Sequence, residues 1–580
     1  MAVRDVVDVD VLIIGSGAGG LSAAICAAKA GLKVVVAEKA DVVGGTTSFS
    51  GGVPWIPENH QMSAHGLSDS RQKALEYLSH AAGRCMRPEM IERYLDVAPE
   101  ALLYFERNTE VRFRIRPQMP DYSSEVPGAQ LGRCLETLPF DGSRLGADFV
   151  HLRMPRPETT VFGGMMISLP DLKAMLNARR SLSAFLHTAG IVARHAVERL
   201  RHHRGTRLVN GNALAARLFR SALDAGVEIW RQAPASELLC EGRRVVGARI
   251  RRGESEIEVR SRCGTVLATG GFPQSTEMRA RYLPNADVHR SLAPHDNAGQ
   301  GIRMALAAGA VLEQINEDNA FLTPVSVFKD KNGKEQVFPH LITDRTSPGS
   351  IIVNKQARRF INEADNYQFV VQAMRDNGNQ GIPAFLICDA DFIQRYGLGR
   401  VRPFPFPRGS FVKDGYLFRG ETLADLAAQL GLDGKVLAET VDRFNQGARQ
   451  GIDTEFGRGA SAYNRYMGDA ANAHGPCLAP LQKPPFYAVK LYPGDIGTSL
   501  GIRVDADARA LDTEDRPIDG LYVCGNDMNS IFAGTYATGG ITIGPALTFG
   551  FIAARHMSKR NARTQSVSRA SLGLSIASEP

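Results

Sequence analysis

Residues 7–39 read VDVDVLIIGSGAGGLSAAICAAKAGLKVVVAEK and decide the fold. The apolar run that ends at Ile14 is typical of a strand buried on both faces, and the alanine-rich run after Gly20 suits a helix packed closely on a sheet. Between them, Gly15, Gly17 and Gly20 form the pattern G-x-G-x-x-G, which permits a tight turn, close approach of the backbone to a pyrophosphate, and close helix–strand packing. The stretch therefore predicts a strand, a turn and a helix whose N-terminus binds an anion.

A carboxylate stands at the right distance beyond this turn. Glu38 ends the next apolar run, 18 residues after Gly20, where an acidic side chain can bind ribose hydroxyls. Because strand, helix and acid agree, we interpret the stretch as a dinucleotide site. A purely structural strand–turn–helix unit is the alternative.

Further glycine-rich segments suggest which dinucleotide is bound. Residues 44–52 form a second loop of glycines and hydroxyls, 265–271 an apolar strand ending in glycines, and 520–527 a strand closing on a polar turn. Residues 539–556 begin with two glycines and predict a helix that follows them. These separated segments resemble the fumarate reductase/succinate dehydrogenase flavoprotein superfamily over most of residues 8–558.

This resemblance implies an α/β fold: a discontinuous FAD-binding Rossmann-like domain with an inserted α+β substrate-capping domain. We expect the FAD-binding domain at residues 1–312 and 486–560, and the inserted catalytic domain at 313–485. Residues 138–205 are extra relative to the superfamily. Residues 561–580 are rich in Ser, Arg and Ala without apolar periodicity, so we expect a mobile tail.

The same resemblance assigns residues to FAD, which we expect to be held without a covalent bond. They are Gly15, Gly17, Ala18, Gly19, Gly20, Glu38, Lys39, Gly45, Thr46, Thr47, Ser50, Gly51, Gly52, Ala268, Thr269, Gly270, Gly525, Asn526 and Ile541.

Three tyrosines stand in motifs that resemble the 3-ketosteroid Δ1-dehydrogenases. Tyr122 follows an aspartate in DYSSEVPG, Tyr367 lies in RRFINEADNYQFV, and Tyr536 precedes Gly540 in GTYATGG. In fumarate reductases the last stretch carries a substrate-binding His and an Arg region, which this sequence lacks. Dicarboxylate binding needs such cations, so fumarate reduction is the less favoured activity.

The resemblance gives each group a role in desaturation beside a ketone. The Tyr536 hydroxyl and the Gly540 N–H would stabilise the enolate oxygen, because preorganised donors act on developing charge. Tyr367 would remove the α-proton, with Tyr122 as its hydrogen-bonding helper. A phenol with a pKa of about 10 is a poor base at neutral pH without such help.

The resemblance implies an FAD-dependent oxidoreductase that desaturates a 3-oxosteroid between carbons 1 and 2 and passes electrons to an external acceptor, a quinone or another. Ser123-Ser124, Ala537-Thr538-Gly539 and Ser499-Leu500 depart from the family pattern beside the expected ring pocket. A small alicyclic ketone, of the cyclohexanone or oxocyclohexane-carboxylate type, therefore remains the alternative substrate. A flavin-fold protein that serves only as a binding or membrane-docking module is a further alternative.

Composition excludes several other classes. The net charge is +7 over 580 residues with 22% charged residues, too weak an excess to indicate a nucleic-acid partner. The eight cysteines contain no C-x-x-C pair, so we expect reduced thiols and no metal site. Without a run of about 18 apolar residues, we expect a cytoplasmic protein.

Residues 172–205 are the one stretch that suggests a membrane contact. They show apolar residues at helical spacing together with six arginines and a single acid, Glu198. A basic amphipathic helix can lie on an anionic membrane, which would place the protein peripherally on the inner membrane face. A solvated helix or an oligomer contact is the alternative.

Overall fold

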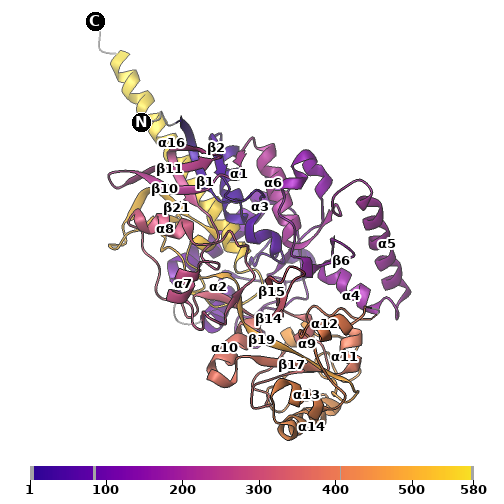
Figure 1. Ribbon diagram of the computed structural model, residues 1–580. Coiled ribbons are helices and arrows are strands. Elements are labelled where there is room, and N and C mark those ends of the chain that lie inside the picture. Colours follow the sequence, from indigo (N-terminus) through magenta and orange to yellow (C-terminus); the bar gives the residue numbers. More distant parts are fainter. Residues whose placement is uncertain (1–4, 83–85, 405, 577–580) are drawn as a thin grey trace.

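The computed structural model describes residues 5–82, 86–404 and 406–576. Helices and strands alternate along the chain around two main sheets, which confirms the α/β fold. Figure 1 shows the larger sheet in the upper part of the molecule and the second sheet, with its own helices, in the lower part.

The larger sheet positions the glycine-rich turn. Its strand order is β10-β11-β21-β12-β1-β2-β9. The strands are β1 (Asp5–Ile14), β2 (Val34–Ala37), β9 (Glu228–Trp230), β10 (Ala235–Glu241), β11 (Arg244–Arg252), β12 (Ser255–Leu267) and β21 (Pro517–Val523), with β20 (Arg509–Leu511) pairing β21. Strand β1 pairs in parallel with both β2 and β12, so the turn after Ile14 leaves the carboxyl edge of the sheet between two neighbours.

Two helices from opposite ends of the chain pack together beside this sheet. They are α1 (Ala18–Lys29) and α16 (Ile543–Ile576). A Cβ on Gly550 of α16 would lie 2.5 Å from the carbonyl oxygen of Gly19, so a glycine at position 550 is needed for this approach. The predicted glycine start into a helix is thus present, beginning at Ile543.

Apolar periodicity predicts no helix beyond residue 560, yet α16 continues to Ile576 and projects from the body (Figure 1). Alanine and arginine favour helix even without an apolar face, which apolar periodicity alone does not detect. The mobility expected for this segment stays a prediction, and residues 577–580 lie outside the described part.

The second sheet forms the core of the expected cap. Its strand order is β15-β14-β19-β17-β16, with β13 and β18 paired to β19. The strands are β13 (Arg290–Ser291), β14 (Ala320–Lys329), β15 (Glu335–Pro339), β16 (Ser350–Val353), β17 (Ala384–Cys388), β18 (Phe418–Gly420) and β19 (Phe486–Thr498). The sequence placed residues 486–498 with the FAD-binding part, whereas β19 pairs with β14 and β17 and so belongs to the cap sheet.

The region from 138 to 205 contains two helices rather than the single run that its periodicity indicated. They are α4 (Leu169–Asn177) and α5 (Leu182–Arg199). The break falls at Ser181, whose side chain accepts a hydrogen bond from the Ala184 N–H and so caps the start of α5. Figure 1 shows α5 at the right-hand edge of the molecule, with α4 between it and the cap helices.

The remaining helices cover the two sheets. They are α2 (Arg71–Ala81), α3 (Pro88–Asn108), α6 (Asn210–Asp224), α7 (Thr276–Tyr282), α8 (Gln300–Ala307), α9 (Thr343–Thr346), α10 (Tyr367–Asp376), α11 (Ala390–Arg395), α12 (Gly409–Lys413), α13 (Leu423–Leu430), α14 (Gly434–Gln450) and α15 (Ala462–Met467). Within the described residues, no helix is both long and apolar enough to span a bilayer.

Candidate active site

One large cavity of about 1880 Å³ lies where the larger sheet, the cap and the α4–α5 region meet. Its lining includes the β1–α1 turn at one end, the three motif tyrosines, and side chains of α4 and of the cap segment 399–411. Drug-sized ligands occupy pockets of about 300–1,000 Å³, so this volume accommodates a dinucleotide and a second molecule together.

The glycines of the β1–α1 turn have the three properties that a dinucleotide requires. Gly15 has a φ of +107°, and a Cβ there would lie 2.3 Å from the Ala268 carbonyl oxygen. A Cβ on Gly20 would lie 2.1 Å from the Gly15 oxygen, so this glycine allows close helix–strand packing. A Cβ on Gly17 would lie 3.8 Å from its nearest neighbour, Thr47 Oγ1, so the backbone at Gly17 is open toward the cavity. The turn therefore fits a pyrophosphate at the start of α1.

Most of the residues that the sequence assigned to FAD line this cavity. Exceptions are Gly20, which packs against β1, and Ile541, which is buried beside the cavity-lining Gly540. The lining members are Gly15, Gly17, Ala18, Gly19, Glu38, Lys39, Gly45, Thr46, Thr47, Ser50, Gly51, Gly52, Ala268, Thr269, Gly270, Gly525 and Asn526.

Several polar residues that sequence reasoning missed hold these loops in place. Asn297 donates to Thr46 Oγ1 at 2.9 Å and to the Gly270 carbonyl at 3.1 Å, which joins two of the separated segments. The buried Asp527 carboxylate accepts from Thr269 Oγ1 at 2.9 Å and from the Gly271 N–H at 2.8 Å. Three of these four contacts join residues more than 200 positions apart, and spacing along the chain gives no signal for them.

The three motif tyrosines come together on the cavity wall. The ring centroids of Tyr367 and Tyr536 are 5.0 Å apart, and that of Tyr122 lies 5.9 Å from Tyr367 and 6.2 Å from Tyr536. All three side chains are buried. Tyr463 of α15, which sequence reasoning missed, is the fourth member, with its ring 4.5 Å from that of Tyr122.

The loop that carries Tyr536 and Gly540 is fixed on both sides. Asn366 Nδ2 donates to the Tyr536 carbonyl at 2.6 Å, and the Tyr77 hydroxyl donates to the Ala537 carbonyl at 2.5 Å. Gly540 has a φ of +100°, and a Cβ there would lie 2.6 Å from the Trp55 nitrogen. Only glycine fits at this position, which lines the cavity, and its N–H lies in hydrogen-bond contact with the Tyr536 hydroxyl.

Burial dominates the titration of these phenols. It raises the pKa of Tyr122 and Tyr367 well above the usual value, and the neighbouring tyrosines raise both further. Burial also raises the pKa of Tyr536, although hydrogen bonds with Tyr367 and Thr542 oppose the rise. All three groups are therefore neutral phenols at physiological pH, able to donate a hydrogen bond.

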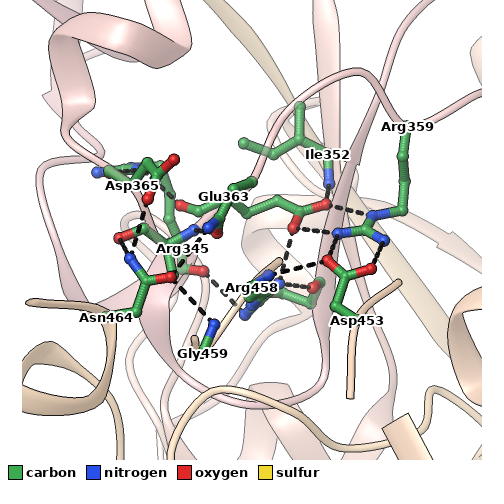
Figure 2. Close-up of polar contacts among 12 residues, drawn as sticks. Arg345, Ile352, Arg359, Glu363, Asp365, Asp453, Arg458, Gly459 and Asn464 are labelled. Carbon is green, nitrogen blue, oxygen red and sulfur yellow. Dashed lines mark hydrogen bonds and ion pairs between the residues drawn. The ribbon is translucent and has the colours of Figure 1, made fainter. Parts of the chain in front are cut away.

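A buried ion network lies next to the segment that leads to Tyr367. Arg359 and Glu363 of this network belong to the RRFINEAD stretch, and its other members come from later in the chain. Arg359 binds both oxygens of Glu363 at 2.8 Å and also the Asp453 carboxylate at 2.8 Å. Arg458 lies 3.2 Å from Glu363 (Figure 2). The network lies under the segment that leads into α10, whose first residue is Tyr367.

Arg345 and Asn464 connect this network to the tyrosines. Arg345 donates to the carbonyls of Glu363 and Asp365, at 2.6 and 3.1 Å. Asn464 Nδ2 donates to Asp365 Oδ1 at 3.0 Å, and Asn464 is the neighbour of Tyr463 in α15 (Figure 2). The elements that carry Tyr367 and Tyr463 thus share one set of buried partners.

Fold and site together define a dinucleotide-binding α/β protein with an inserted cap and a wall of buried phenols. The model of the FAD binding domain family matches residues 10–543. The chain is 38% identical to 4-oxocyclohex-2-ene-1-carboxylate 5-dehydrogenase of Sinomonas cyclohexanicum, covering 95% of this chain and 94% of that protein. It is 35% identical to 3-oxosteroid 1-dehydrogenase of Mycobacterium tuberculosis, covering 94% and 98%.

A solved structure gives the same result. The crystal structure of 3-ketosteroid delta1-dehydrogenase from Sterolibacterium denitrificans, in complex with 1,4-androstadiene-3,17-dione, has a TM-score of 0.89 and 36% identity, covering 95% of this chain and all of that one. The chain belongs to the FAD binding domain family, among the FAD-dependent dehydrogenases of the 3-oxosteroid 1-dehydrogenase type. FAD is its cofactor, and the glycine turn fits the pyrophosphate of such a dinucleotide.

Proposed function

We propose that the protein desaturates a 3-oxosteroid between carbons 1 and 2. The observation that carries the proposal is the meeting of Tyr122, Tyr367 and Tyr536 on the wall of the cavity that also contains the dinucleotide turn. Met119, Leu172, Met175 and Leu176 extend this wall with apolar side chains, which suits a large apolar ring system.

The first chemical step places negative charge on the ketone oxygen. Removal of the proton from the carbon beside the carbonyl converts the ketone into an enolate, so the oxygen needs donors that are already in place. The Tyr536 hydroxyl and the Gly540 N–H are such donors, because burial keeps the phenol protonated and the glycine holds its N–H at the wall.

Tyr367 takes the α-proton in this proposal. Its raised pKa argues against a standing phenolate, so the hydroxyl must lose its own proton as it gains the new one. Tyr122, in hydrogen-bond contact with Tyr367, receives that proton while its own hydroxyl proton passes on to solvent, so both tyrosines end the step as neutral phenols. FAD, when bound in this cavity, supplies the acceptor for the hydride that leaves the β-carbon, and an external acceptor such as a quinone then takes the electrons.

The second candidate substrate is a small ring ketone. The relative that is 38% identical carries the name of an oxocyclohexene-carboxylate dehydrogenase, and the tyrosine chemistry is the same for any ring with a hydrogen-bearing carbon pair beside the ketone. The large cavity favours the steroid, because a single ring would leave most of the apolar wall without contact.

Turnover with an added electron acceptor tests the proposal. Androst-4-ene-3,17-dione should lose two hydrogens to give the 1,4-diene, which mass spectrometry and chromatography against an authentic standard identify. Conversion of 4-oxocyclohexanecarboxylate in a sample that leaves the steroid unchanged would overturn the steroid assignment and keep the tyrosine chemistry.

We also propose that α5 is a peripheral contact with an anionic membrane. Leu182, Phe185, Leu186, Val197 and Leu200 are exposed and follow one another at helical spacing on this helix and its end. Arginines flank them, and Glu198 is the single acid on α5. Apolar side chains that insert among lipids and cations that contact headgroups suit such a surface.

A further inference from the structure

Four arginines at one end of the cavity have no carboxylate partner in the described part of the chain. We call Arg179, Arg180, Arg400 and Arg402 the rim arginines. Arg179 and Arg180 lie between α4 and α5, and Arg400 and Arg402 lie in the cap segment after α11. The cavity reaches the surface here, because Phe162 and Phe404 line it and are each about half exposed, 47% and 50%.

The acids that line the same cavity have other partners. Asp296 pairs with Arg153, Glu158 with Arg156 and Asp391 with Lys483. Asp344 contacts His340 and the Gly399 N–H, and Asp330 accepts from backbone amides of its own turn. Glu38 accepts from Ser16 and Ala40. The rim therefore carries an uncompensated positive charge toward the cavity.

Aromatic rings surround the guanidinium of Arg400. It lies 3.5 Å from the ring centroid of Phe328, 5.5 Å from that of Phe411 and 5.8 Å from that of Tyr416. Rings on several sides fix the plane of the cation and leave its N–H groups without an anion. Arg179 and Arg402 stack in the same way on Phe404 and Phe406.

A buried polar chain, which the proposed chemistry does not use, fixes the backbone at Arg400. His340 lies between Asp344 and Ser326, with Nδ1 2.6 Å from Asp344 Oδ2 and Nε2 2.7 Å from Ser326 Oγ. Ser326 continues to the Tyr416 hydroxyl at 2.7 Å, which accepts the Arg400 N–H at 3.1 Å. Such a chain positions the segment that carries Arg400.

We propose that the rim arginines bind a carboxylate at the end of the substrate remote from its ketone. This inference rests on the proposed function and narrows its substrate class to 3-oxosteroids with an acidic side chain. Strand β14 runs between the two groups: Phe321 near its start packs on Tyr536, and Phe328 near its end packs on Arg400. The tyrosines take the ketone at one end of this stretch, and the Arg400 guanidinium takes the anion at the other. A charge-assisted bond to a preorganised arginine makes the acid a tighter ligand than its uncharged ester.

The test compares 3-oxochol-4-en-24-oic acid with its methyl ester, which has nearly the same shape without the charge. Calorimetry on the FAD-loaded protein under anaerobic conditions, with the flavin already reduced so that no turnover occurs, gives both dissociation constants. We expect the acid to bind about tenfold more tightly than the ester in the wild type. Arg400→Gln should bring this ratio close to one, and Arg400→Lys should restore part of it.

Arg107→Gln is the matched control, because Arg107 is exposed on α3, forms no ion pair with the residues that the structure describes, and lies outside the cavity lining. It should keep the wild-type ratio. Equal affinities of acid and ester in the wild type, or a ratio that Arg400→Gln leaves unchanged, would overturn the subsite. Loss of binding to anionic vesicles by Arg400→Gln at an unchanged ratio would also overturn it and assign the rim to lipid.

The two proposals fail in different ways. Turnover of androst-4-ene-3,17-dione tests the proposed function independently of the subsite, because this steroid is neutral and has no carboxylate. A protein that oxidises this steroid but binds acid and ester equally retains the function and loses the subsite. A protein that binds the acid more tightly but oxidises no steroid retains the subsite and loses the function.

Discussion

At the scale of single residues, the account depends on Tyr536 as a neutral donor. Tyr536→Phe removes one hydroxyl that acts only on developing enolate charge, so flavin reduction by a bound ketone should slow about 10²- to 10³-fold. Bound FAD should be unchanged, because the phenol is proposed to contact the substrate. Rapid-mixing absorbance under anaerobic conditions measures the rate. Tyr522→Phe, at a buried tyrosine outside the cavity lining, is the control, and a wild-type rate in Tyr536→Phe would remove the phenol from the mechanism.

The raised pKa of Tyr367 makes a prediction for pH dependence. If Tyr367 first had to become a phenolate, the reduction rate would increase tenfold for each unit of rising pH, as long as the pH stays below the pKa of the phenol. With the proton relayed through Tyr122 to solvent in the same step, the reduction rate should stay nearly flat between about pH 7 and 9. Stopped-flow reduction across this range measures it, and a tenfold rise per unit would contradict the coupled transfer.

At the scale of elements, the ion network under α10 should control stability and site geometry together. Glu363→Gln removes the anion shared by Arg359 and Arg458, which leaves buried charge without its partner. We expect a loss of about 3–5 kcal/mol in the free energy of unfolding. Denaturant unfolding measures the change. An unaltered midpoint would show that the network does not contribute this free energy to stability.

The same carboxyl gives the sign of the acid dependence. Burial alone would raise the pKa of Glu363, but the charges of Arg359 and Arg458 outweigh it and hold the pKa below the ordinary value of 4.5. Its contribution is therefore present above pH 4.5 and is lost as the pH falls through the lower folded-state value. Glu363→Gln should flatten this part of the stability profile.

The helix α5 offers a second test at this scale. Phe185→Ser with Leu186→Ser removes two exposed apolar side chains and should reduce sedimentation with anionic lipid vesicles several-fold, while the fold stays intact. Ile452→Ser, at a residue 57% exposed beyond α14, is the matched control and should sediment as the wild type does. Wild-type sedimentation of the double variant would exclude α5 as the membrane contact.

Elements differ in how far the sequence predicts them. The first strand, turn and helix could be predicted because the glycine pattern carries local constraints: Gly15 and Gly20 show close atomic approaches, and Gly17 leaves the backbone open toward the cavity. The assignment of β19 to the cap could not be predicted, because its pairing with β14 and β17 is decided by partners about 100 to 180 positions away. The break between α4 and α5 rests on one serine cap within a continuous apolar pattern.

At the scale of the whole molecule, the cavity is the feature that is hardest to predict from the sequence. The motifs carrying Tyr122, Tyr367 and Tyr536 were recognisable, but their meeting on one wall, and the addition of Tyr463, follow from the packing of the cap against the larger sheet. The rim arginines carry no motif. An anion site can be inferred from them only in the structure, where α4, α5 and the segment after α11 converge at one opening.

The most direct test of the central claim is one anaerobic mixing experiment. The FAD-loaded protein is mixed with androst-4-ene-3,17-dione, and the visible absorbance of the bound flavin is followed while the steroid is recovered for identification. The account predicts rapid bleaching with formation of the 1,4-diene in equal amount to the flavin reduced. An unbleached flavin with this steroid, in a sample that 4-oxocyclohexanecarboxylate does bleach, would contradict it.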